Sequence, residues 1–199
     1  LPIDYKKKNR ELSTNKIKLI LKEAVSLGCL TVKFTGGEPL LREDFKDIYL
    51  FARQNGLKVQ LYTNATLITP DLAEIFRHIP PLEKIEITLY GMKKESYEKV
   101  TRKIGSFKSA WQGINLLKKN KIPFIVKGAL LPYNKTEIKQ FEKWAKTIPW
   151  MDGEPIYSMF FDLRCRRDNP LKNQLITNLR YSPENGLKIL TGNKNKFQS

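Results

Sequence analysis

The chain has 199 residues, 41% of them hydrophobic and 28% charged, and its formal net charge is +16. Its length suits one domain with its own core. The sequence has no apolar run long enough to span a bilayer, and its two cysteines give no disulfide framework. We therefore expect a cytoplasmic protein without membrane contact. The positive charge comes mostly from lysines spread along the chain, which is typical of solvated helix faces and argues against a nucleic-acid partner.

Hydrophobic periodicity divides the chain into alternating helices and strands. The expected helices cover residues 13–27, 44–54, 70–78, 107–119 and 137–146, and the expected strands cover residues 30–34, 57–62, 84–90, 124–130 and 157–161. Strands that alternate with helices at this spacing must pair in parallel through helical crossovers, so the predicted fold class is α/β. Periodicity alone leaves open whether the sheet curls toward a barrel or stays open and doubly wound.

The loop after the first expected strand has the composition of a ligand-binding turn. It contains Gly36 and Gly37, which allow positive φ and close backbone approach, followed by Glu38 and Pro39. Pro39 fixes φ and suits the start of a helix, and this arrangement predicts that Glu38 points out of the strand tip. A carboxylate beside exposed carbonyl groups suits an ammonium ion, which needs acceptors on several sides.

Polar or glycine-containing segments also follow the later strands. Thr63 and Asn64 follow the second strand, Thr88 lies near the end of the third, and residues 131–134 follow the fourth. A single Thr-Asn pair would ordinarily be a turn or a helix cap. Because ligands of parallel α/β folds bind at the carboxyl ends of the strands, the repetition predicts a shared pocket at that edge.

These motifs resemble those of the radical SAM enzymes over nearly the whole chain. Thr-Gly-Gly-Glu-Pro-Leu (35–40) resembles the family signature, Thr-Asn-Ala-Thr-Leu-Ile (63–68) resembles its Thr-Asn-Gly-Thr-Leu-Ile, and Ile-Thr-Leu-Tyr-Gly (87–91) is similar to its Ile-Ser-Leu-Asp/Tyr-Gly. The resemblance implies a partial (β/α)6 TIM-like barrel that binds S-adenosylmethionine (SAM), with the glycine loop at its amino group and a hydroxyl at its ribose. The implied cofactor-binding residues are Gly36, Gly37, Glu38, Pro39, Thr63, Asn64 and Thr88.

The ligands of the family's [4Fe-4S] cluster do not occur in this sequence. Family members hold that cluster with a Cys-x3-Cys-x2-Cys loop after their first barrel strand, whereas Cys29 and Cys165 are far apart. We therefore assign no metal ligand and no catalytic residue to this chain. We interpret it as a fragment that begins past the first strand and the cluster loop, with residues 1–162 as the core and residues 163–199 as a linker toward a C-terminal auxiliary-cluster domain.

The resemblance is strongest to the branch with such a C-terminal extension, the SPASM type, whose members modify peptides or proteins. It implies that intact relatives use SAM, a [4Fe-4S] cluster, a peptide or protein substrate and an electron donor, and that this chain alone is inactive. The alternative is a non-catalytic basic α/β domain that binds nucleic acid or an acidic peptide. Salt-sensitive binding to nucleic acid would distinguish this alternative from a SAM-binding domain.

Several further residues carry expectations of their own. Cys29 lies between Gly28 and an expected buried strand, which predicts a small core residue. Cys165 stands between arginines, which favour its thiolate. Many family members carry an arginine for the cofactor carboxylate before the fourth helix, but counting back from Gly-Ser-Phe (105–107) puts Thr101 there, with Arg102 one position away.

Overall fold

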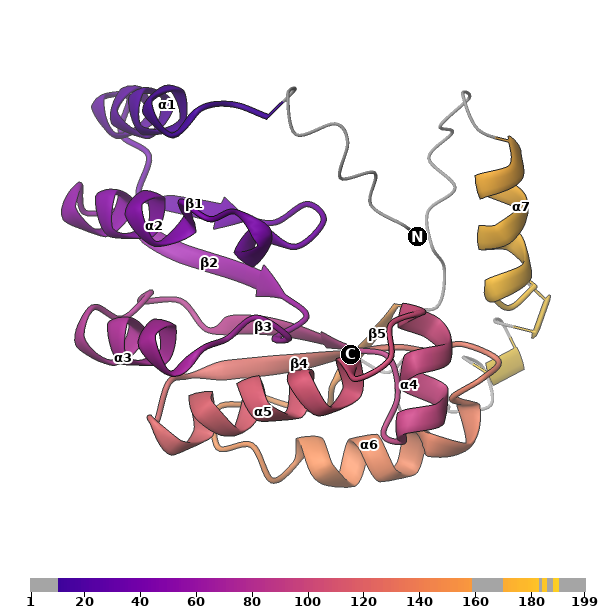
Figure 1. Ribbon diagram of the computed structural model, residues 1–199. Coiled ribbons are helices and arrows are strands. Elements are labelled where there is room, and N and C mark those ends of the chain that lie inside the picture. Colours follow the sequence, from indigo (N-terminus) through magenta and orange to yellow (C-terminus); the bar gives the residue numbers. More distant parts are fainter. Residues whose placement is uncertain (1–10, 159–169, 183, 186–187, 190–199) are drawn as a thin grey trace.

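The computed structural model describes residues 11–158, 170–182, 184–185 and 188–189, and a five-stranded parallel sheet forms its centre (Figure 1). The strand order β1-β2-β3-β4-β5 follows the sequence order. The strands are β1 (Thr31–Phe34), β2 (Lys58–Thr63), β3 (Ile85–Leu89), β4 (Phe124–Ala129) and β5 (Ile156–Ser158). The helices are α1 (Thr14–Ser26), α2 (Phe45–Gln54), α3 (Pro70–His78), α4 (Lys94–Thr101), α5 (Ser106–Lys119), α6 (Ile138–Ala145) and α7 (Pro170–Leu179), with short 3-10 turns η2 (Pro39–Leu41) and η3 (Lys135–Glu137).

These elements confirm the predicted α/β class and a parallel sheet consistent with a partial TIM-like barrel. Local signals explain several boundaries: the side chains of Ser13 and Thr69 accept backbone N–H groups of α1 and α3, and Pro70 occupies the first turn of α3. Helices α4 and α7 were not expected from the sequence. No described helix is long and apolar enough to cross a membrane.

One face of the sheet is packed against helices, and its core is made by alternate strand residues. Val59, Leu61, Ile85 and Ile87 are fully buried and belong to one hydrophobic cluster with side chains of α2, α3, α5 and α6. The side chains between them in sequence lie on the opposite face, which is less buried. The two faces therefore differ in chemistry, and both meet the loops at the carboxyl ends of the strands.

Helix α4 begins at a cap supplied from another part of the chain. Its N-cap residue, Lys93, makes no side-chain capping bond, and Oε2 of the buried Glu137 instead accepts the backbone N–H groups of Met92 at 2.5 Å and Lys93 at 3.1 Å. The hydroxyl of Ser96 donates to the same oxygen at 3.0 Å. One carboxylate thus satisfies orphan donors at the positive end of the helix and ties α4 to η3.

The loop after β2 packs tightly against α5. Ala65 is buried and has φ 61°, a left-handed conformation that an alanine adopts with strain. A Cβ added to Gly113 would lie 2.1 Å from the Ala65 carbonyl oxygen. Glycine at position 113 is therefore what lets α5 approach this loop.

The two cysteine predictions have different outcomes. Cys29 is exposed, so its assignment to the core was wrong. It precedes β1, whose residues are only exposed or half-buried because this strand pairs on one side only, with β2, within the described sheet. Cys165 lies outside the described residues, as does most of the strand expected at residues 157–161, of which β5 covers the start.

Candidate functional site

The loop between β1 and η2 presents open backbone at the carboxyl edge of the sheet. Gly36 and Gly37 are both exposed, and Gly36 has φ +126°, which favours glycine. A Cβ added to Gly36 would have nothing within 4 Å. The loop therefore leaves room beside its backbone for a ligand group.

Glu38 does not point out of the strand tip as predicted. Its side chain is buried and turns onto the end of β2, where Oε1 accepts the Thr63 hydroxyl at 2.7 Å and Oε2 accepts the Asn64 backbone N–H at 2.8 Å. Oε1 also accepts the Leu40 N–H at 3.2 Å. The donors at the neighbouring strand end thus outcompete solvent for this carboxylate, and Glu38 fastens the glycine loop to β2.

Burial also changes the acidity of this cluster. Desolvation raises the pKa of the Glu38 carboxyl above its ordinary value, and the hydrogen bonds from Asn64, Thr63 and Leu40 offset part of that rise. Burial likewise raises the pKa of Tyr90, and the charge of Glu38 adds to the effect. The carboxylate therefore lies in a poorly solvated region next to aromatic side chains.

The pH dependence of stability should reveal this buried carboxyl group. Because the pKa of Glu38 is higher in the folded than in the unfolded chain, its stabilising contribution is complete below the unfolded pKa and declines as pH rises through the folded pKa. We expect the free energy of unfolding of the wild type, relative to Glu38→Gln, to increase as pH falls from about 7 toward about 4.3, the ordinary glutamate value. Urea titrations of both proteins at several pH values measure this difference, and a difference independent of pH would contradict the expectation.

Asn64 shapes the loop after β2. Its Oδ1 accepts the backbone N–H of Thr66 at 2.9 Å and the Thr66 hydroxyl at 2.6 Å. This side-chain turn holds the loop that also contains Ala65. The structure therefore joins Glu38, Thr63 and Asn64 in one hydrogen-bonded unit across two strand ends.

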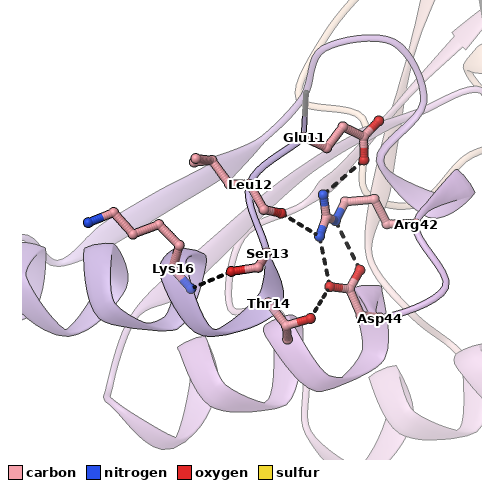
Figure 2. Close-up of polar contacts among 7 residues, drawn as sticks. All are labelled: Glu11, Leu12, Ser13, Thr14, Lys16, Arg42 and Asp44. Carbon is pink, nitrogen blue, oxygen red and sulfur yellow. Dashed lines mark hydrogen bonds and ion pairs between the residues drawn. The ribbon is translucent and has the colours of Figure 1, made fainter. Parts of the chain in front are cut away.

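Arg42 holds the other end of the glycine loop (Figure 2). Its guanidinium donates to both carboxylate oxygens of Asp44, at 2.9 and 2.7 Å, and also to Glu11 and to the Leu12 carbonyl. The hydrogen bond from Arg42 lowers the pKa of Asp44, and Thr14 donates to the same carboxylate at 2.6 Å. The network connects η2, the start of α2 and the segment that enters α1. Sequence reasoning missed this network, although Arg42 closes the same glycine-rich segment.

Thr88 lies on the neighbouring strand, beside Ile87, which is in register with Thr63. Its side chain is half-buried on the face of the sheet opposite α5, and it is in register with Lys127 of β4. Arg102 is exposed and ends α4 in a left-handed conformation, whereas the Thr101 hydroxyl lies 2.7 Å from that of Ser106. Thr88 thus lies near the carboxyl end of β3, and Arg102 is the residue that ends α4.

Comparison with known proteins shows to which family this chain belongs. The sequence profile of the radical SAM superfamily matches residues 3–148. This chain belongs to the radical SAM superfamily. The radical SAM chain is 30% identical over 151 residues to the AdoMet-dependent heme synthase of Methanosarcina barkeri, an alignment that covers 76% of this chain and 42% of that enzyme.

Two further proteins are similar to this chain in sequence or in fold. The Fe-coproporphyrin III synthase of Methanosarcina barkeri is 30% identical over 105 residues, which are 53% of this chain and 26% of that protein. A solved structure of anSMEcpe with bound AdoMet and Kp18Cys peptide has a TM-score of 0.54 and 20% identity, and the match covers 82% of this chain and 48% of that one. This radical SAM chain therefore spans less than half the length of the relatives that it matches.

The described residues of this radical SAM domain fit SAM and an iron–sulfur cluster unequally. The open backbone at Gly36 suits a polar ligand group. Among the described residues, by contrast, no three His, Cys, Asp or Glu side chains gather to hold a metal. The sequence has two cysteines, fewer than the three thiolates of the cluster-binding loop of the family.

Proposed function

We propose that this radical SAM domain binds SAM along the edge formed by the glycine loop, the Thr63–Asn64 loop and Thr88. The observation that carries the proposal is the exposed loop at Gly36, which is fastened through Glu38 to β2 and through Arg42 to Asp44. A loop fixed at both ends loses little conformational freedom when a ligand binds its backbone. The exposed backbone of Gly36 and Gly37 would hold the amino group of SAM, and the Thr88 hydroxyl would approach its ribose.

In an active enzyme of this family, SAM would supply a 5′-deoxyadenosyl radical by one-electron cleavage of its sulfonium C–S bond, with methionine as the other product. The residues of this chain would bind and orient the cofactor and exclude water beside the buried Glu38 cluster. Glu38 acts here as a positioning residue, because both of its oxygens are used inside the protein. The two cysteines of this chain cannot supply the three thiolates of the family's cluster loop, so we expect this chain alone to leave SAM uncleaved.

Two substrate classes have support of different kinds. A peptide or protein substrate is supported by the solved structure of this fold that holds a peptide together with AdoMet. A tetrapyrrole substrate is supported by the two relatives named for haem and Fe-coproporphyrin III synthesis, one of which aligns with 76% of the chain. With either class of substrate, the domain would bind SAM at the same edge, so SAM binding is tested first.

Saturable binding of SAM to the full chain is the expected result in equilibrium dialysis. Gly36→Ala should weaken this binding about tenfold, because φ +126° is strained for an alanine and the loop backbone must move. Gly153→Ala is the matched control: Gly153 is also exposed and its added Cβ also meets nothing within 4 Å, but no positive φ is required there.

Circular dichroism and urea titration would show that both variants are folded. Absence of saturable SAM binding to the folded wild type would overturn the proposal. Equal affinities of Gly36→Ala and Gly153→Ala for SAM would show that the glycine loop is not part of the SAM site. Salt-sensitive binding of nucleic acid in the absence of SAM binding would favour a basic binding domain instead.

A further inference from the structure

The face of the sheet opposite the helix-packed core carries polar side chains on adjacent strands. Lys33 is on β1, Tyr62 on β2, Glu86 on β3 and Lys127 on β4. Tyr62 and Glu86 are in register, as are Thr88 and Lys127. This polar face adjoins the proposed SAM edge, because Lys33 is only three residues before Gly36, which is about 10 Å along an extended chain.

Two lysine ammonium groups converge on one aromatic ring of this face. Nζ of Lys33 lies 4.8 Å from the centroid of the Tyr62 ring, and Nζ of Lys127 lies 5.5 Å from the same centroid. The ring attracts both cations through its quadrupole, but it carries no net charge to balance them. The two positive charges therefore border the same tyrosine ring.

Glu86 balances only one of these charges. Its carboxylate lies 2.8 Å from Nζ of Lys127, and its side chain is 8% exposed. Lys33 is exposed and has no carboxylate partner among the residues that the structure describes. The group formed by Lys33, Tyr62, Glu86 and Lys127 consequently has one excess positive charge beside a hydroxyl-bearing strand end.

We propose that Lys33 and Lys127 bind a carboxylate group of a small-molecule substrate over the Tyr62 ring. The proposal rests on the proposed function, because the site is placed next to the SAM edge and assigns a substrate class to the same domain. The occupant is a carboxylate carried by a tetrapyrrole. Lys33 supplies its unpaired charge, and Lys127 contributes a donor while its own charge remains balanced by Glu86.

The charge of the site favours one carboxylate over a nucleotide triphosphate. A single excess positive charge matches one carboxylate. The carboxylates of a porphyrin stand on separate side chains, so one of them can meet the site alone, whereas the negative charges of a triphosphate are adjacent and would need further cations around them. The relatives named for haem and Fe-coproporphyrin III synthesis agree with this chemistry, since coproporphyrin carries peripheral carboxylates. The chemical distinction can therefore be tested with coproporphyrin III, its tetramethyl ester and GTP.

Titration of the full chain with coproporphyrin III, followed by absorbance and tryptophan fluorescence, tests the proposal. We expect saturable binding that Lys33→Met weakens about tenfold, the effect of one charge-assisted contact. Lys127→Met should also weaken binding, but it leaves the buried Glu86 without its ion-pair partner and could misfold the protein. Lys33→Met leaves that ion pair intact, so its effect on binding is free of this complication. Lys58→Met is the matched control, because Lys58 is exposed at the far end of β2 and its loss changes the net charge equally.

Each outcome decides the proposal. Binding of the tetra-acid that exceeds binding of the tetramethyl ester and depends on Lys33 but not on Lys58 supports it. Equal effects of Lys33→Met and Lys58→Met would overturn it and leave nonspecific attraction to a basic chain. GTP or a glutamate-rich peptide that binds more tightly through Lys33 would overturn the assignment of the occupant.

SAM binding by the same preparations separates this inference from the proposed function. If SAM binds and coproporphyrin III does not, the carboxylate site is wrong while the SAM edge stands. If coproporphyrin III binds through Lys33 and SAM does not bind, the proposed function fails and the carboxylate site loses its assigned role as a substrate site. Gly36→Ala should affect SAM and leave the affinity for coproporphyrin III within about twofold, because an exposed loop substitution leaves the lysines in place.

Discussion

Replacing Gly113 with alanine is expected to lower the free energy of unfolding by about 3 kcal/mol, the upper end of the usual cost of overpacking. The new Cβ would lie 2.1 Å from the Ala65 carbonyl oxygen and 3.1 Å from the Cβ of Ile68. The first of these atoms belongs to the backbone of a fully buried residue, so a side-chain rotation cannot relieve the clash. Either α5 or the loop after β2 must move.

Urea unfolding of Gly113→Ala and Gly153→Ala measures this effect against a glycine in open space, where we expect a change within about 0.5 kcal/mol. Because the displaced loop contains Asn64, SAM binding should weaken as well. A Gly113→Ala protein as stable as the wild type would show that α5 does not approach Ala65 this closely.

Removing the Glu137 carboxylate should have a comparable effect on stability. In Glu137→Ala, the N–H groups of Met92 and Lys93 and the Ser96 hydroxyl lose their shared acceptor at the start of α4, where Met92 and Ser96 are buried. Unsatisfied buried groups of this kind cost about 1–3 kcal/mol each, and partial entry of water limits the expected total to about 3 kcal/mol. Urea titration measures the loss, and hydrogen exchange at Met92 and Lys93 locates it.

Two companion variants give the comparison its meaning. Glu137→Gln keeps an acceptor oxygen but loses the charge at the helix end, so it should lose about 1 kcal/mol. Glu23→Ala removes an exposed glutamate from α1 and should change the free energy of unfolding by about 0.5 kcal/mol or less. If Glu137→Ala is no more destabilising than Glu23→Ala, the remote cap of α4 is wrong.

The α/β architecture was predictable because the strands and most of the helices have local sequence signals. Apolar residues at spacing 2 or 3.6, Ser13 and Thr69 at helix starts, and glycine or proline at the turns all agree with the observed elements. The carboxyl edge followed from the parallel pairing of these strands. At this edge the hydrogen bonds of Glu38 with Thr63 and Asn64 join residues of two expected motifs.

The features that were missed or wrongly predicted depend on residues that are distant in sequence. Helix α4 has the polar sequence Lys-Glu-Ser-Tyr-Glu-Lys-Val-Thr and no local cap, because its cap, Glu137, comes from the β4–α6 connection. The inward direction of Glu38 likewise depends on donors at the end of β2. Cys29 was misplaced because the burial of β1 depends on its neighbours in the sheet. Local spacing contains none of this information.

The sequential order of the sheet also has a kinetic consequence. Each strand pairs with the one before it, and the widest separation in the register is that between Ile85 and Phe124. None of the described strands must wait for a segment from the other end of the chain, so contact order stays low for a parallel sheet. During synthesis, each emerging strand can add to the edge of a sheet that already exists, one helical crossover at a time.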